Sequence, residues 1–404
     1  MRLTIVNQFY APDLSPTAQL AASLAEHRAR AGDNVTVVAG TGAYGGGQPV
    51  AAPTTSANPR VRRAWTPSLG RATVLRRLAD YLVFFAQAKW TLLTLPAQDV
   101  ILLMTTPPYI ALTGLAHKLL HPHTRMILWS MDCYPETLVA AGALRARGLP
   151  ARLLGALTAA LFRWLDDVVC LDAAMEVRLK SSYARGATPY FAVLPNWEPA
   201  ARFPPADRCV VWEGFERLGL RRKSVIVYQG NAGTGHRFDT VLAACRLLGD
   251  DFAFLFVGGG SAWETLGAAR LSGGIANLHL EPYVPAETVA GVLAGADAAL
   301  ITLRDEMLGV MSPSKLHAAL AMGVPIVYIG PAGGNVHEAI ERFGCGVSLR
   351  HGDVDGLVAF LERLRARSDL RAELSARARA AFEAAYSDRA GLARFDTLLD
   401  GPPD

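Results

Sequence analysis

Residues 225–237, with the sequence VIVYQGNAGTGHR, decide the fold of this chain. An apolar, β-branched run passes into Gly230, Gly233 and Gly235 and then into FDTVL, a pattern that predicts a strand, a tight turn and a helix. Glycine lets the backbone approach a ligand, and the amides at a helix start attract phosphate. Such turns also occur in α/β domains without a ligand, so this segment alone leaves both interpretations open.

Short apolar runs alternate with amphipathic, helix-like stretches along the rest of the chain. We expect strands at residues 3–9, 35–39, 100–104, 126–131, 168–171, 191–194, 225–229, 252–257, 277–280, 298–303, 326–329 and 346–349. Strand-helix alternation in two blocks is typical of two doubly wound α/β domains with parallel sheets. Ligands bind beyond the carboxyl ends of such strands, so the residues that follow each strand are the first site candidates.

The length of 404 residues favours two domains, and a proline-rich stretch at residues 195–207 separates the two blocks. We therefore expect an N-terminal domain at 1–198 and a C-terminal domain at 199–385. Residues 370–399 look helical throughout, and we expect residues 386–404 to form a helix that packs back on the N-terminal domain.

The composition is that of a soluble globular protein, with 51% hydrophobic and 19% charged residues. A net charge of +4 is too small to indicate nucleic acid as a partner. Five cysteines without C-x-x-C spacing indicate neither a disulfide framework nor a zinc site. No apolar signal segment precedes the first strand, and Pro107-Pro108 interrupt the uncharged stretch 100–116, so we expect a cytoplasmic protein without a membrane span.

Two further segments strengthen the case for a nucleotide. Gly258-Gly259 follow the expected strand 252–257, giving a second glycine turn in the same sheet. In the segment SPSKLH, Ser312 suits a helix N-cap and Pro313 the first helical position, which puts Lys315 in the first turn. The helix dipole disfavours a cation there, so Lys315 either extends into water or shares an anionic ligand with the helix start; the glycine turns favour the ligand.

These motifs together resemble the retaining glycosyltransferases of family 4, which have the GT-B fold of two Rossmann-like domains facing a central cleft. The resemblance covers nearly the whole chain and rests on six motifs in the same order. The motifs are YAPD at 10–13, MDCYPE at 131–136, LPNW at 194–197, YQGNAG at 228–233, PSK at 313–315 and AMGVP at 321–325. The resembled subgroup transfers amino or deoxy sugars from UDP-type donors during assembly of bacterial surface polysaccharides, often onto polyprenyl-linked acceptors.

The resemblance implies that the C-terminal domain binds a nucleotide-sugar donor and that the N-terminal domain binds a saccharide or lipid-linked acceptor. It implies no metal and no other cofactor. The residues that it assigns to the donor and its diphosphate are Gly230, Asn231, Ala232, Gly233, His236, Arg237, Gly258, Gly259, Tyr283, Val284, Pro313, Ser314 and Lys315. Tyr283 and Val284 lie where the family reads the base through backbone groups, although a tyrosine there also suits plain packing.

The chain departs from the broader family at its charged positions. The Arg and Lys that usually grip the donor diphosphate correspond to Asn231 and His236, so we expect Arg237 and Lys315 to replace them. The family's glutamate pair, spaced eight apart, corresponds to Val310 and Ala318. Both carboxylates are missing, as they are in the resembled subgroup.

The implied reaction is substitution at an anomeric carbon with retention, in which the leaving diphosphate takes the acceptor proton. Asp132 ends a strand at the position of the family's catalytic-site residue, and we expect it to hold the acceptor hydroxyl or offset charge at the anomeric carbon, assisted by Glu136. Alternatively, Asp132 caps a helix that begins near Thr137. Asp13 and Thr17 follow the first strand and either meet the acceptor or cap the next helix.

Arginines and aromatic residues gather at residues 75–90 and 145–164, and Arg60, Arg62, Arg63, Arg71, Arg76 and Arg77 fall in a stretch without acidic residues. This composition suits docking at the inner face of an anionic cytoplasmic membrane, or helices packed on the N-terminal sheet. Three functions remain open: transfer to a lipid-linked or saccharide acceptor, transfer to a soluble small molecule, and a non-transferase role such as a UDP-sugar epimerase. The sequence favours the first.

Overall fold

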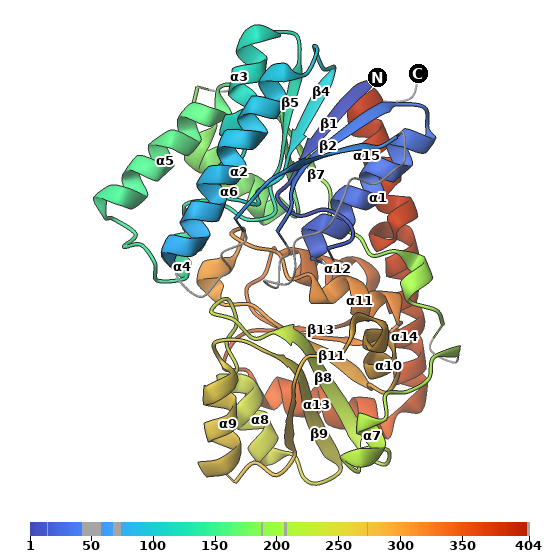
Figure 1. Cartoon of the computed structure of the whole chain (residues 1–404). Helices are drawn as coiled ribbons and strands as arrows, with labels where there is room; N and C mark the ends of the chain where they lie inside the picture. The colour runs from blue at the N-terminus through green and yellow to red at the C-terminus, as the bar shows by residue number, and fades with distance from the viewer. Residues whose placement is uncertain are drawn as a thin grey trace.

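The computed structural model describes residues 1–13, 15–42, 58–67, 74–186, 189–205, 208–272 and 274–401. It consists of two α/β domains, coloured blue to green and yellow to orange in Figure 1, each with one parallel sheet and helices packed around it. The predicted pair of doubly wound domains is therefore confirmed.

Within the described residues, the N-terminal sheet has seven parallel strands in the order β3-β2-β1-β4-β5-β6-β7. The strands are β1 Arg2–Val6, β2 Asn34–Gly40, β3 Arg60–Ala64, β4 Val100–Leu103, β5 Arg125–Trp129, β6 Asp167–Cys170 and β7 Tyr190–Val193. The interior strands are apolar and buried on both faces, as helices on the two sides of a parallel sheet require.

The described part of the C-terminal domain has a six-stranded sheet in the order β10-β9-β8-β11-β12-β13. The strands are β8 Ser224–Asn231, β9 Phe252–Gly259, β10 Leu278–Glu281, β11 Ala298–Thr302, β12 Ile326–Ile329 and β13 Gly346–Leu349. The strand order reverses between β8 and β11, and a switch point of this kind opens a crevice for ligands. Gly230 lies near the end of β8 at this point, and Gly233 and Gly235 follow the strand.

Helices connect the strands and cover the sheets (Figure 1). In the N-terminal domain they are α1 Pro16–Arg30, α2 Val74–Thr94, α3 Leu112–Leu120, α4 Glu136–Ala140, α5 Leu149–Phe162 and α6 Ala173–Tyr183. After the crossing they are α7 Gly214–Arg217, α8 Asp239–Leu247, α9 Trp263–Ser272, α10 Val289–Ala294, α11 Lys315–Ala321, α12 Asn335–Phe343, α13 Val354–Ala366, α14 Ser368–Ala381 and α15 Asp388–Asp400. No helix of the described residues has both the length and the apolar character needed to cross a membrane.

All twelve predicted strands are present, and β3 is the strand that the sequence did not predict. Its sequence RVRRA lacks apolar alternation, and it lies at the sheet edge, where charged side chains block pairing with other chains. Arg63 turns inward from β3, donating from Nη1 to the Gly40 carbonyl at 3.2 Å, so it does not belong to the expected basic face. Arg71 and the side chain of Arg77 lie outside the described residues.

Residues 370–399 do not form the single continuous helix that the sequence predicts. Helix α14 passes into a π-helical turn at Phe382–Tyr386 and ends there, because the backbone of Ser387 is extended and pairs with Glu198. Ser387 then caps α15 by accepting a hydrogen bond from the Ala390 amide. The chain therefore crosses between the domains twice at one place, at Glu198 and at Ser387.

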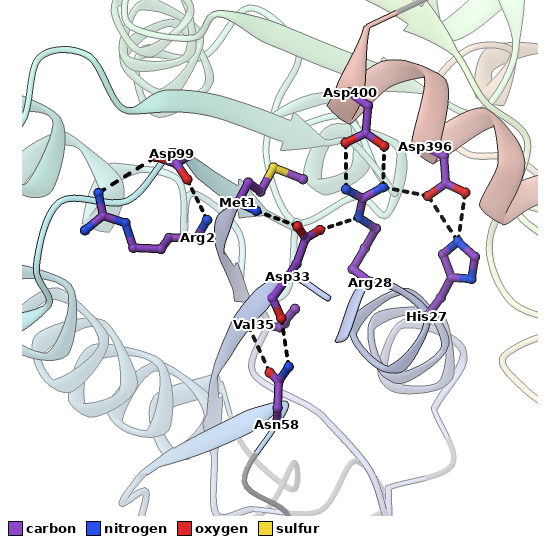
Figure 2. Close-up of polar contacts among 10 residues, drawn as sticks. All are labelled: Met1, Arg2, His27, Arg28, Asp33, Val35, Asn58, Asp99, Asp396 and Asp400. Atoms are coloured by element: carbon purple, nitrogen blue, oxygen red, sulfur yellow. Dashed lines mark hydrogen bonds and ion pairs between the residues drawn. The ribbon is translucent and has the colours of Figure 1, made fainter. Parts of the chain in front are cut away.

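A network of polar contacts holds α15 against α1 of the N-terminal domain (Figure 2). Arg28, whose side chain is only 6% exposed, pairs with Asp33 at 2.6 Å, with Asp396 at 2.8 Å and with Asp400 at 2.6 Å. His27 adds a contact of 2.8 Å to Asp396. Nearby, Phe395 packs against the rings of Trp129 and Trp197 in the core of the domain.

Candidate active site

A cavity of about 710 Å³ lies between the domains, beside the switch point of the C-terminal sheet. Strands β8 and β11 and helices α10 and α11 supply apolar walls, and Pro16 and Glu198 line it from the α1 and crossing side. Its polar or aromatic lining residues are Glu198, Gln229, Asn231, His236, Tyr283, Ser312, Ser314 and Lys315. A largely apolar cavity with a few polar groups is typical of a small-molecule site.

Glycines at the mouth of this cavity allow two strands to lie close together. Gly230 has φ +108°, and a side chain at Gly258 would clash with the Gly230 carbonyl oxygen. A side chain at Gly259 would press on the Tyr283 ring. These glycines therefore have a packing reason to be present, besides any close approach to a ligand.

The segment between β8 and α8 leaves some backbone donors without hydrogen-bond partners among the described residues. The Ala232 amide is used, since it donates to the Gly259 carbonyl at 2.6 Å. Among the hydrogen bonds of the described residues, none uses the amides of Gly233, Thr234 and Gly235. Helix α8 begins only at Asp239, later than the sequence predicted, so these amides belong to a turn rather than to the helix start. Successive free amides in a turn form a concave site for an anion.

Lys315 brings a cation into the cavity without a carboxylate partner. Its Nζ donates to the Asn231 carbonyl at 3.2 Å and lies 4.9 Å from the centre of the Tyr228 ring. The ion pairs among the described residues include none with Lys315. Burial lowers the pKa of this lysine to about 7. An anionic ligand would satisfy the charge that the protein leaves unpaired.

His236 fixes the position of Lys315. Its Nδ1 donates to the Thr302 carbonyl at 2.6 Å, so Nε2 is free to accept from Lys315 Nζ at 3.1 Å. Burial, and secondarily the charge of Lys315, lowers the pKa of His236 to about 3. The imidazole therefore stays neutral and orients the ammonium without compensating its charge.

Helix α11 begins at Lys315, with Ser314 at the N-cap position and no side-chain cap. The prediction that Ser312 caps the helix and that Pro313 is its first residue is therefore wrong by two residues. Because Pro313 has no amide hydrogen, the free amides begin after it. Ser312, Pro313 and Ser314 nevertheless all line the cavity beside Lys315.

Asp132 lies where the two domains touch. It follows β5 and forms an antiparallel bridge with Met311, directly before the SPSK segment, while the Cys133 amide donates to the Val310 carbonyl at 3.0 Å. Burial raises the pKa of the Asp132 carboxyl to about 6. Helix α4 has Pro135 at its N-cap position and no side-chain cap, so the alternative that Asp132 caps this helix is wrong.

Comparisons with known proteins agree with this architecture. The sequence signature described as "Glycosyl transferases group 1" matches residues 223–367, which carry the glycine turn and Lys315. The chain contains a group 1 glycosyltransferase domain. The predicted relationship to glycosyltransferases is thereby confirmed for these residues.

Two curated bacterial proteins are similar to part of the chain. "Probable glycosyltransferase WbjE" of Pseudomonas aeruginosa is 26% identical over 66% of each chain. "Putative colanic acid biosynthesis glycosyl transferase WcaI" of Escherichia coli (strain K12) is 25% identical over 58% of each chain. The matched stretches thus span about two thirds or less of these relatives.

Solved structures share the fold over almost the whole chain. Sucrose-phosphate synthase from Thermosynechococcus elongatus superposes with a TM-score of 0.73 at 15% identity, covering 99% of this chain and 98% of its own. Anabaena HepE, solved with UDP and glucose, gives 0.70 at 12% identity, and WaaG gives 0.65 at 16%, each covering 99% of this chain and 100% of its own. The fold is therefore GT-B, as predicted.

Other predicted donor residues of the glycosyltransferase domain lie at or beyond the cavity rim. Tyr283 lines the cavity and is 62% exposed, whereas Val284 packs on the apolar core. Arg237 points away: its guanidinium pairs with Asp239 at 2.6 Å and is half exposed, and it does not line the cavity. The structure thus brings Lys315, and not Arg237, to the place of the expected cationic clamp.

Glu136 lies in a different cavity, of about 530 Å³, on the far side of the Asp132 bridge. It accepts a hydrogen bond from the Tyr183 hydroxyl, and its Oε2 is buried without a partner among the described residues. Arg152, Arg178 and Arg304 line the same cavity. Asp132 lines neither this cavity nor the one of 710 Å³; it lines a third space, of about 40 Å³, with Thr105 and Ser130. The structure therefore does not bring Asp132 and Glu136 to one cavity.

Asp13 and Thr17 lie at the start of α1. Asp13 accepts from the Ser15 amide at 2.7 Å, which favours the local turn that precedes the helix. Thr17 is in the first turn of α1, next to Pro16, which lines the 710 Å³ cavity. Glu198 is an acidic lining residue that the sequence analysis did not predict. It directly follows the LPNW motif, and this position at the crossing is the signal that marks it.

Proposed function

We propose that this chain is a glycosyltransferase that binds a nucleotide-sugar donor in the 710 Å³ cavity and transfers the sugar to an acceptor held by the N-terminal domain. The observation that carries this proposal is the arrangement around Lys315. Lys315 brings a cation without a carboxylate partner into a largely apolar cavity, and the turn that joins the lining residues Asn231 and His236 has three amides that form no hydrogen bond among the described residues. A diphosphate between an aromatic base and a sugar matches that arrangement in charge and shape.

We propose a UDP-linked amino or deoxy sugar as the donor. Tyr283 offers an aromatic surface at the rim near Gly259, where a base can pack. Among the proteins of similar structure, Anabaena HepE was solved with UDP and glucose. Assays over a panel of nucleotide-sugar donors test the identity of the base and of the sugar directly.

The proposed reaction retains the anomeric configuration and uses no metal ion. Lys315 and the turn amides would stabilise the negative charge that develops on the leaving diphosphate, which itself takes the acceptor proton. Asp132, ionised above pH 6, would hold the acceptor hydroxyl or offset positive charge at the anomeric carbon. These are positional and electrostatic roles, and they require no protein nucleophile.

We propose a saccharide or polyprenyl-linked acceptor at the inner face of the cytoplasmic membrane. Helix α5 exposes Leu149 and Leu153, at 66% and 62%, together with Arg152 between them. Helix α2 exposes Leu82 and Trp90. Exposed leucine and tryptophan beside arginine suit shallow insertion into an anionic bilayer.

A thermal-shift screen of nucleoside diphosphates, followed by transfer assays over UDP-sugars, tests the proposal. We expect UDP to raise the melting temperature more than GDP, ADP or UMP, because only a matched diphosphate fills the cavity. Transfer to a polyprenyl-linked acceptor would identify the leading function. Transfer only to soluble acceptors, or conversion of a UDP-sugar without transfer, would contradict the proposed acceptor or the proposed reaction.

A further inference from the structure

Glu198 is the only acidic side chain among the described residues that line the 710 Å³ cavity. It lies on the N-terminal side of the crossing between the domains, one residue after the buried Trp197. An acid facing a site built for an anion needs a reason, because it repels the diphosphate that Lys315 would attract. The position of Glu198 on the wall of the cavity suggests such a reason: the carboxylate can bind another part of the same ligand.

The backbone holds Glu198 rigidly although it belongs to a connection between domains. Its amide donates to the Tyr386 carbonyl at 3.1 Å, and its carbonyl accepts from the Asp388 amide at 3.1 Å. These bonds form the bridge with Ser387 at the second crossing. These two hydrogen bonds therefore fix the backbone position from which the carboxylate extends.

The carboxylate keeps acceptor capacity for a ligand. Arg202 Nη1 reaches Oε2 at 3.4 Å but is closer to Gln19 Oε1, at 2.7 Å. Among the described residues, no hydrogen bond uses Glu198 Oε1. The side chain is 24% exposed. An ionised carboxylate has room for about four hydrogen bonds, so most of this capacity is unused.

A smaller cavity, of about 50 Å³, places Glu198 next to the first turn of α11. Glu198 lines this space together with Ser314 and His317, and Ser314 lines both cavities. Asn196 Oδ1 and His317 Nε2 are buried there without partners among the described residues. Unpaired polar atoms in such a space indicate that a hydroxyl or a water completes them.

Helical spacing puts Ala318 beside this group, since it is one turn on from Ser314. Ala318 lines the large cavity but has no polar atom with which to bind a ligand hydroxyl. Glu198 is the carboxylate that lines the same cavity. If the diphosphate of a ligand contacts Lys315, the ring attached to that diphosphate would face the cavity wall that carries Glu198 and Ala318.

We propose that Glu198 binds the ribose hydroxyls of the donor nucleotide and so selects ribonucleotides. This inference rests on the proposed function. A carboxylate accepts hydrogen bonds from both hydroxyls of a vicinal diol, and an acid serves the ribose in this way in other dinucleotide sites. Glu198 is thus a specificity-determining residue that reaches the donor from the opposite side of the crevice.

Calorimetric titration of the full chain with UDP and with 2′-deoxy-UDP tests this assignment. We expect the wild type to bind UDP about tenfold more tightly, because the deoxy compound leaves the carboxylate short of a donor. Glu198→Gln and Glu198→Ala should bring the ratio of the two dissociation constants close to one. Glu383→Gln removes a comparable ion pair with Arg379 outside the cavity and should keep the wild-type ratio.

The outcomes separate this inference from the proposed function. If UDP binds and the Glu198 variants keep the wild-type ratio, Glu198 does not read the ribose and the inference is overturned. Equal losses for both nucleotides would overturn it as well, because they would assign Glu198 to another part of the ligand. If neither UDP nor GDP binds to the wild type, the proposed function itself fails.

Discussion

Lys315 Nζ lies 3.1 Å from Nε2 of His236, so that an ammonium group rests against an imidazole that cannot neutralise it. The Thr302 carbonyl fixes the imidazole from its other side at 2.6 Å. Burial lowers the pKa of both groups, to about 7 for the lysine and about 3 for the histidine. The pair is therefore organised for an anion that the protein does not itself provide.

Replacing Lys315 should weaken donor binding without destabilising the fold. We expect Lys315→Met to raise the dissociation constant of UDP by about 10- to 100-fold, the value of a charge-assisted hydrogen bond. The melting temperature should stay the same or rise, because a desolvated cation is removed. Calorimetry and thermal unfolding measure the two effects.

Arg237→Ala is the matched comparison for Lys315→Met. Because Arg237 pairs with Asp239 outside the cavity, we expect its replacement to change the UDP dissociation constant less than about threefold. An equal loss in the two variants would mean that the cationic clamp includes Arg237, contrary to this structure.

Donor binding should weaken as the pH rises through 7. Burial lowers the pKa of Lys315 from 10.5 to about 7, so the free protein loses this charge above pH 7 while the unfolded chain keeps it. Binding of UDP-N-acetylglucosamine, which has no phosphate that titrates in this range, should therefore take up a proton. Between pH 7 and 9 we expect its affinity to fall by up to about tenfold per pH unit.

The same measurement on Lys315→Met provides the control for this pH dependence. The variant should bind weakly at every pH and take up no proton. A wild-type affinity that stays constant from pH 7 to 9 would show that Lys315 does not contact the diphosphate.

Asp132 should matter for turnover and not for donor affinity. We expect Asp132→Asn to lower kcat by about 100-fold or more while UDP binds as in the wild type. Because burial raises the pKa of Asp132 to about 6, wild-type kcat should fall as the pH drops below 6. Steady-state rates at saturating donor, from pH 5 to 8, check both points; a near-normal kcat in the variant would remove Asp132 from the reaction.

The contact between α1 and α15 should contribute strongly to stability. Arg28→Met removes the ion pairs with Asp33, Asp396 and Asp400 and leaves Asp33, which is 8% exposed, with only the N-terminal ammonium of Met1 as a cationic partner. We therefore expect the free energy of unfolding to fall by about 3 kcal/mol. Arg28 also lowers the pKa of Asp400 below 3.8. That contribution is present above pH 3.8 and is lost as the pH falls through the lowered value. Urea unfolding of wild type and variant at pH 7 measures the first effect, and a series of measurements below pH 3.8 measures the second.

Exposed leucines of α5 should contribute to membrane binding. We expect Leu153→Glu to reduce co-sedimentation with vesicles that contain anionic lipid by about tenfold, since it places a negative charge at the proposed contact. Leu271→Glu alters a leucine on α9 of the other domain that is even more exposed, at 85% against 62% for Leu153, and should bind as the wild type does. Equal binding by both variants would argue against docking through α5.

The sequence predicts the sheets well because both faces of most strands are buried. In a chain of this length, apolar, β-branched runs such as those of β8 and β11 are stable only when they are buried inside a sheet. Strand β3 was missed since its stability comes from pairing with β2 and not from burial of its own side chains. Edge strands of this kind carry little local signal.

The candidate site was only partly predictable, for reasons of geometry. Lys315 is identified by an unusual charge at a helix start, and this signal is local. The direction of Arg237 depends on Asp239, two residues away, and on a turn longer than the sequence suggested. For Glu198 the local signal is its position directly after the LPNW motif, but the pairing with the distant Ser387 that fixes it beside the cavity is not encoded locally.

The most direct test of the central claim is a crystal structure of the chain with UDP. We predict the diphosphate within hydrogen-bond distance of Lys315 Nζ and of the amides of Gly233–Gly235, with the base toward Tyr283. Density for UDP elsewhere on the protein, with the cavity beside Lys315 empty, would contradict the account.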